Sequence, residues 1–130
     1  MKTITLITNS DILNLEDTIK LSKKLSRIGL DRIQIREKNI PKNKLRNFIK
    51  KMKDSTDETC KLILNGNFDL AVEYNLNGVH FPEKYPITKK FSTKNLIIGR
   101  SIHENTKLTN DLNNFDYFHL GPIFTTLSHP

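Results

Sequence analysis

The stretch that decides the fold is KLILNGNFDLAVEYNLNGVHF, residues 61–81. Its first part, Lys61–Leu64, is apolar and predicts a strand that ends at Asn65-Gly66-Asn67. Phe68–Tyr74 predicts a short helix, and Gly78–Phe81 predicts a second strand that Pro82 ends. A strand, a helix and another strand in direct succession indicate a parallel sheet with right-handed crossovers.

The same alternation extends to both sides of this stretch. Strands are predicted over Thr3–Thr8, Arg32–Ile35, Asn95–Ile98 and Asp116–Leu120. Helices are predicted after an N-cap at Asn14, from Pro41 to about Lys53, and over Glu104–Leu112. The first helix is expected to bury an apolar face and to end at a glycine cap, with the residues Leu15, Ile19, Leu21, Leu25, Ile28 and then Gly29.

Two architectures fit this order of elements. One is a doubly wound open sheet, and the other is a (β/α)₈ barrel of which six strands are present. A complete barrel needs ~200 residues or more, so the chain would stop after the sixth strand. Periodicity does not choose between the two, but both place their chemistry at the carboxyl ends of the strands.

Composition limits the classes of protein. The 130 residues suit a single domain, 1–130, and no apolar run approaches a membrane span. The single cysteine, Cys60, excludes an internal disulfide framework and a multi-cysteine zinc site, and a reducing, cytoplasmic compartment is expected. The net charge is +7, yet the densest basic run, Lys42–Lys53, has the apolar spacing of an amphipathic helix. Its lysines therefore indicate a solvated face, and we expect neither nucleic acid nor membrane as partner.

The polar residues at one predicted strand end suggest an anion site. Gln34, Arg36 and Lys38 alternate with Ile35 and Glu37, so an extended backbone puts the two cations and the amide on one face. An arginine fork and a lysine point charge can hold a phosphate or pyrophosphate. The alternative is a solvent-exposed strand end whose charge Glu37 balances.

Other strand ends carry further candidates. Asn65 is either a ligand amide or part of an Asn-Gly turn before a helix N-cap. His80 and His103 follow strands and could serve as acid and base, or be packed and surface residues. The four histidines lack partners at ligand spacing, so no metal site is predicted. Hydroxyls in the last loop, Thr126 and Ser128, could bind phosphate.

Five segments, taken in order, resemble the thiamine phosphate synthase/TenI family of (β/α)₈ barrels. They are IQIREK (33–38), LILNGNFDLA (62–71), GVHFP (78–82), IIGRSIH (97–103) and DYFHLGPIFTT (116–126). The resemblance implies a barrel, here C-terminally incomplete. It also implies an enzyme of thiamine biosynthesis that binds a phosphorylated thiazole or pyrimidine.

The resemblance assigns roles to residues of this chain. Gln34, Arg36 and Lys38 match the pyrophosphate-binding strand, and Asn65 matches the amide of an Asn-Asp-Arg motif. His80 matches the histidine beside the pyrimidine pocket. The hydroxyls of two strand-end loops are matched by Ser101, Thr126 and Ser128.

Departures from the synthase pattern favour the TenI branch. The synthase has an aspartate where this chain has Gly66, and a second one shortly after the Gly-Val-His segment, where this chain has only Glu83. Because magnesium bound to a pyrophosphate requires carboxylate oxygens, the first expectation is a metal-free thiazole tautomerase with His103 as general acid/base. One alternative is thiamine phosphate synthase with Mg²⁺, and another is a non-catalytic binding paralogue or truncated remnant. The sequence leaves the oligomeric state open, a homo-oligomer included.

Overall fold

Six parallel strands form one sheet in the computed structural model, which describes residues 2–85, 95–103 and 114–121. The strands are β1 (Thr5–Ile7), β2 (Arg32–Ile35), β3 (Lys61–Asn65), β4 (Gly78–Phe81), β5 (Ile97–Ile102) and β6 (Tyr117–Leu120). The helices are α1 (Leu15–Arg27), α2 (Lys42–Ser55) and α3 (Phe68–Glu73).

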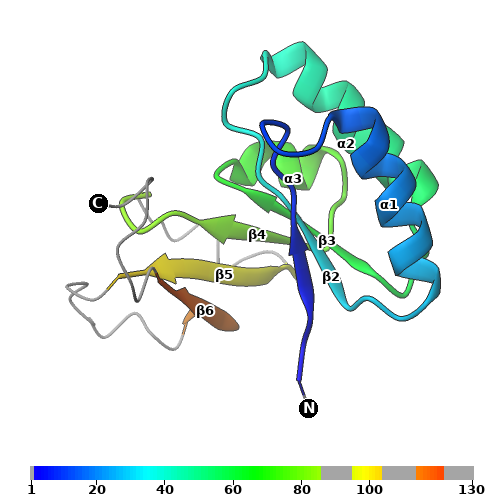
Figure 1. Ribbon diagram of the computed structural model, residues 1–130. Coiled ribbons are helices and arrows are strands. Elements are labelled where there is room, and N and C mark those ends of the chain that lie inside the picture. The colour runs from blue at the N-terminus through cyan, green and yellow to red at the C-terminus, as the bar shows by residue number, and fades with distance from the viewer. Residues whose placement is uncertain (1, 86–94, 104–113, 122–130) are drawn as a thin grey trace.

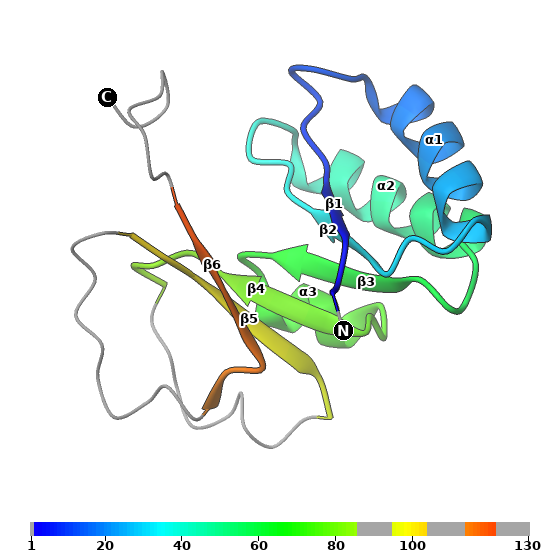
Figure 2. The same cartoon turned by 60° about the horizontal axis from the view of Figure 1, so that its bottom comes forward.

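The order of the strands distinguishes the two predicted architectures. Neighbours in the sheet follow the chain from β1 to β6 without reversal. The three helices lie on one side of the curled sheet, as Figures 1 and 2 show. A doubly wound sheet reverses its strand order at a switch point and carries helices on both faces. The described strands therefore form the half-barrel that the barrel prediction requires, with β1 and β6 at its two edges.

The hydrophobic core lies between the sheet and the helices. Strand alternation sends every second side chain of β2, β3 and β4 to this outer face, where α2 and α3 cover them. The largest side chains there are buried almost completely, and the list includes Ile33, Ile35, Phe48, Ile49, Met52, Leu62, Leu64, Val79 and Phe81.

Helix α2 confirms the interpretation of the lysine-rich run. Phe48, Ile49 and Met52 are buried, and Lys50 and Lys51 are exposed. Within the described ranges, every helix is too short or too polar to cross a membrane.

Helix α1 begins and ends as predicted. The side chain of Asn14 accepts a hydrogen bond from the backbone N–H of Asp17 at 2.8 Å, so it is the N-cap. Gly29 follows the helix with φ +105°, a conformation that favours glycine.

The predicted buried face of α1 is partly wrong. Leu21 is 37% exposed and Ile28, which lies just past the helix, is 81% exposed. Thr18, Ser22 and Ser26 are buried in their place. Their four-residue spacing puts three small side chains on one stripe, and small side chains let a helix approach its neighbours closely.

Strand β5 also differs from its prediction, Asn95–Ile98. It begins at Ile97 and continues to Ile102, through Gly99, Arg100 and Ser101, beyond the predicted end at Ile98. Gly99 has a packing role, because a Cβ there would lie 2.0 Å from Cζ of Tyr117. The predicted helix Glu104–Leu112 lies outside the described residues.

Candidate functional site

The face of the sheet opposite the helices carries polar side chains. Gln34 stands between the outward-facing Ile33 and Ile35, and His80 stands between Val79 and Phe81. Gln34 and His80 are each 1% exposed. Because all strands are parallel, their carboxyl ends meet at one edge. The polar side chains of this inner face include Arg32, Gln34, Asn65, His80, Ser101, Tyr117 and His119.

Gln34 and Asn65 form a pair across β2 and β3. Asn65 Nδ2 donates to Gln34 Oε1 at 2.9 Å. In the described part of the chain, the buried Nε2 of Gln34 has no acceptor, so this donor is left for a ligand or a water. Gly66, directly after Asn65, has φ +81° and donates its N–H to the His80 carbonyl. That backbone conformation explains a glycine at this position.

Arg36 and Lys38 lie just beyond the end of β2, which stops at Ile35, so strand alternation does not extend to them. Burial and then the neighbouring Arg36 lower the pKa of the Lys38 ammonium. Arg36 also acts on the pKa of His80. The charge of Arg36 therefore affects both Lys38 and His80, and Arg36 is half-buried whereas Lys38 is exposed.

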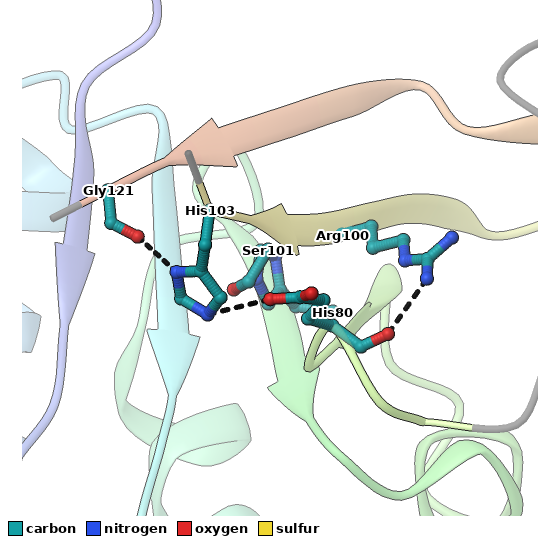
Figure 3. Close-up of polar contacts among 6 residues, drawn as sticks. His80, Arg100, Ser101, His103 and Gly121 are labelled. Atoms are coloured by element: carbon teal, nitrogen blue, oxygen red, sulfur yellow. Dashed lines mark hydrogen bonds and ion pairs between the residues drawn. The ribbon is translucent and has the colours of Figure 1, made fainter. Parts of the chain in front are cut away.

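His80 is held between two hydroxyl groups. Its Nε2 lies 2.7 Å from Ser101 Oγ and its Nδ1 lies 3.0 Å from Tyr117 Oη. Burial, followed by the charges of His119 and Arg36, lowers the pKa of His80 to about 4. His80 is therefore a neutral imidazole near neutral pH. Ser101 and His80 lie side by side in Figure 3.

Three inner-face residues were not among the predicted site residues. The ring of His119 lies 4.8 Å from that of His80 and 5.0 Å from that of Tyr117, between centroids. The Arg32 guanidinium lies over the Tyr117 ring at 4.9 Å. Burial raises the pKa of Tyr117 to about 12, so its hydroxyl keeps its proton. Alternation within the predicted strand Asp116–Leu120 could have placed Tyr117 and His119 on one face.

His103 lies at the mouth of the half-barrel, next to a carboxylate (Figure 3). Its Nε2 lies 3.2 Å from Glu83 Oε2, and its Nδ1 contacts the Gly121 carbonyl oxygen. Arg100 Nη2 donates to the Glu83 carbonyl at 2.8 Å and so fixes the backbone that presents the carboxylate. Both ring nitrogens of His103 therefore face oxygen atoms of the protein.

In the part of the chain that the structure describes, the carboxylates at this edge have partners within the protein. Glu83 faces His103, and Glu37 accepts hydrogen bonds from Thr8 Oγ1 and the Ser10 N–H. Across residues 2–85, 95–103 and 114–121, no three histidine, cysteine, aspartate or glutamate side chains gather as a metal site. Thr126 and Ser128, the predicted phosphate-loop hydroxyls, lie outside the described residues.

The fold and the site define a class of protein: an α/β barrel with polar groups at the carboxyl ends of its strands. A family model described as thiamine monophosphate synthase matches residues 4–130. The chain belongs to this family, whose members act in thiamine biosynthesis.

The relatives are named as synthases. The chain is 32% identical over 120 residues to a putative thiamine-phosphate synthase 2 of Aquifex aeolicus, covering 88% of this chain and 64% of that protein. It is 32% identical over 133 residues to a thiamine-phosphate synthase of Clostridium tetani, covering 97% and 63%. A thiamine phosphate pyrophosphorylase structure from Pyrococcus furiosus shares the fold, with TM-score 0.77, 23% identity, and coverage of 98% and 63%.

These comparisons reverse the order of the two predicted activities. Neither curated relative carries the name of a tautomerase, so they favour the alternative, thiamine phosphate synthase, over the TenI branch. The chain spans less than two thirds of the length of each relative.

Proposed function

We propose that this chain acts in thiamine biosynthesis as a thiamine phosphate synthase, joining a pyrimidine pyrophosphate to a thiazole phosphate. The observation that carries the proposal is the family match along residues 4–130, together with the convergence of polar side chains on the inner face. The names of the relatives support the same reaction.

The inner-face residues would bind and orient the two substrates. Arg36 and Lys38 supply positive charge for the pyrophosphate, which gains negative charge as it leaves. Gln34 offers its Nε2–H, which has no acceptor among the described residues, and Asn65 fixes the Gln34 amide by holding Oε1. Ser101 offers a hydroxyl beside the neutral His80.

The family resemblance implies magnesium as a cofactor of the synthase. Among the described residues, the carboxylate of Glu83 at this edge is paired with His103. The roles proposed here for Arg36, Gln34 and Ser101 depend only on this chain's own groups.

A thiazole tautomerase remains the second candidate, favoured by His103 and by Gly66. His103 pairs with Glu83 at the mouth, which is a suitable arrangement for taking up and releasing a proton. Gly66 stands where a synthase is expected to have an aspartate. Against this candidate, a substrate must displace Glu83 before it reaches Nε2 of His103.

One paired assay tests the proposal and separates the candidates. The purified chain is given both substrates, with and without magnesium, and thiamine phosphate is measured. In parallel, proton exchange at the thiazole carbon is followed in D₂O with the thiazole carboxylate phosphate. We expect thiamine phosphate to form and Arg36→Ala to slow its formation.

Exchange without condensation would overturn the synthase proposal in favour of the tautomerase. In that case His103→Asn is expected to slow exchange by ~10²–10⁴-fold, and His80→Asn is the matched comparison. Substrate binding without either reaction would instead indicate a binding paralogue.

A further inference from the structure

Three side chains on adjacent strands form a continuous hydrogen-bonded chain. Tyr117 of β6 contacts Nδ1 of His80 on β4 at 3.0 Å, and Nε2 of His80 contacts Oγ of Ser101 on β5 at 2.7 Å. His80 is 1% exposed, and Ser101 and Tyr117 are half-buried. This series of hydrogen bonds therefore runs from the barrel interior to the Ser101 hydroxyl at the proposed substrate site.

Packing fixes the orientation of the Tyr117 ring, at one end of this series of hydrogen bonds. Its ring lies directly over Gly99, where an added Cβ would come within 2.0 Å of Cζ. The Arg32 guanidinium covers the ring at 4.9 Å, and the His119 ring lies 5.0 Å away. These contacts leave the hydroxyl aimed at His80 Nδ1.

The chemistry of the three groups sets the direction of the hydrogen bonds. His80 is neutral, so only one of its ring nitrogens carries a proton. A phenol is a stronger acid, and hence a better hydrogen-bond donor, than an aliphatic hydroxyl. Tyr117 keeps its proton, because burial raises the pKa of its hydroxyl. The favoured direction is therefore Tyr117 O–H to Nδ1, then Nε2–H to Ser101 Oγ.

This direction decides what Ser101 can do. An Oγ that accepts from Nε2–H cannot donate its own proton to His80, so that proton is free to be donated to another acceptor. The same direction excludes Ser101 as a nucleophile, because Nε2 of His80 already carries a proton and cannot accept the hydroxyl proton of Ser101. Ser101 is left as a hydrogen-bond donor.

We propose that Tyr117 is a positioning residue which, through His80, makes the Ser101 hydroxyl a donor toward an oxyanion of the substrate. The identity of that oxyanion as a phosphate rests on the proposed function. The direction of the hydrogen bonds does not depend on the proposed function, because it is set by groups within the protein.

The direct test is the tautomer of His80, measured by ¹⁵N NMR of the full chain with labelled histidine and no ligand. Comparison with His80→Gln assigns the signal. We expect a protonated Nε2 and an unprotonated Nδ1 across pH 6–8. Tyr117→Phe keeps the ring but removes the donor, and is expected to mix the tautomers. Tyr74→Phe, which removes the phenol of the residue that follows α3, is the control and is expected to leave His80 unchanged.

A protonated Nδ1 in the unaltered chain would overturn the proposal, and this result does not depend on whether Tyr117→Phe folds. Unchanged tautomers in a folded Tyr117→Phe would also overturn it.

Binding of inorganic phosphate and of the thiazole phosphate, measured by calorimetry, tests the donor role. Ser101→Ala is expected to weaken binding by ~10-fold or more. Tyr117→Phe should weaken it less, and should have no further effect when Ser101 is already alanine, because both act through one hydroxyl. If the losses of binding affinity in the two single variants were additive in the double variant, Tyr117 would not act through Ser101 and the proposal would be contradicted. Failure of the unaltered chain to bind either phosphate, with the expected tautomer present, would count against the proposed function while supporting the hydrogen-bond direction.

Discussion

The two faces of the same strands differ in what holds their side chains. On the outer face, Val79 and Phe81 pack among apolar side chains beneath the helices. On the inner face, His80, the residue between them, is equally buried but makes hydrogen bonds to Ser101 and Tyr117. Burial therefore does not separate the core from the site, whereas the kind of contact does. The outer face supplies stability, and the inner face holds donors and acceptors in place.

The largest expected effect is on the outer face. Phe81 is fully buried, so Phe81→Ala should lower the free energy of unfolding by ~3–5 kcal/mol, through lost apolar burial and the cavity left behind. Urea denaturation measures this change. Ile28→Ala is the control, because Ile28 is 81% exposed and the expected change is within ~0.5 kcal/mol. Equal effects of the two changes would contradict the description of the core.

The inner face should respond to pH where the outer face does not. His80 has a pKa of about 4 in the folded chain, against ~6.5 when unfolded, so the unfolded state binds more protons between these values. Stability should therefore rise with pH across this window, by up to ~3 kcal/mol, and level off above it. His80→Gln should remove most of this rise, leaving the smaller part due to His119. Denaturation midpoints compared at pH 4.5 and pH 7 measure the difference, and an identical rise in the variant would contradict a buried neutral His80.

Removing one member of the Gln34–Asn65 pair should have a smaller effect. Asn65→Ala leaves the buried Gln34 amide without its partner, and we expect a loss of ~1–3 kcal/mol in unfolding free energy. The double variant Gln34→Met/Asn65→Ala removes both polar groups and should recover part of that loss. A double variant less stable than Asn65→Ala would show that the amide pair contributes by packing instead.

The smallest effect on stability is expected at a polar atom buried on the helix side of the sheet. Ser22 of α1 is fully buried, and no partner for its Oγ is present in the described part of the chain. Ser22→Ala should therefore leave stability unchanged or raise it by ~1 kcal/mol, measured by thermal unfolding. A clear loss of stability would indicate that the Ser22 hydroxyl has a partner.

Much of the fold could be predicted because alternation is local. Residues 61–81 contain a strand, a helix and a strand, and the structure has β3, α3 and β4 there with nearly the predicted bounds. The prediction for β5 ended at Ile98, directly before Gly99, whereas the strand continues to Ile102. Glycine is needed there for the packing of Tyr117 from another strand, and a long-range contact of this kind leaves no local signal.

The site was predicted less completely, for the same reason. Strand ends predicted Gln34, Asn65, His80 and Ser101, and the structure brings these residues to one face. The pairing of His103 with Glu83 depends on two loops that meet only in the folded chain. The roles of the site residues remain predictions, those of Thr126 and Ser128 included.

The central claim is that the ligand binds on the inner face of the half-barrel. NMR detection of side-chain amide signals during titration with the thiazole phosphate tests it most directly. We predict saturable shifts of the Gln34 and Asn65 amides, with the amide of Asn47, on the exposed side of α2, unchanged. Shifts confined to Asn47, with Gln34 and Asn65 unmoved, would place the ligand among the helices and contradict the account.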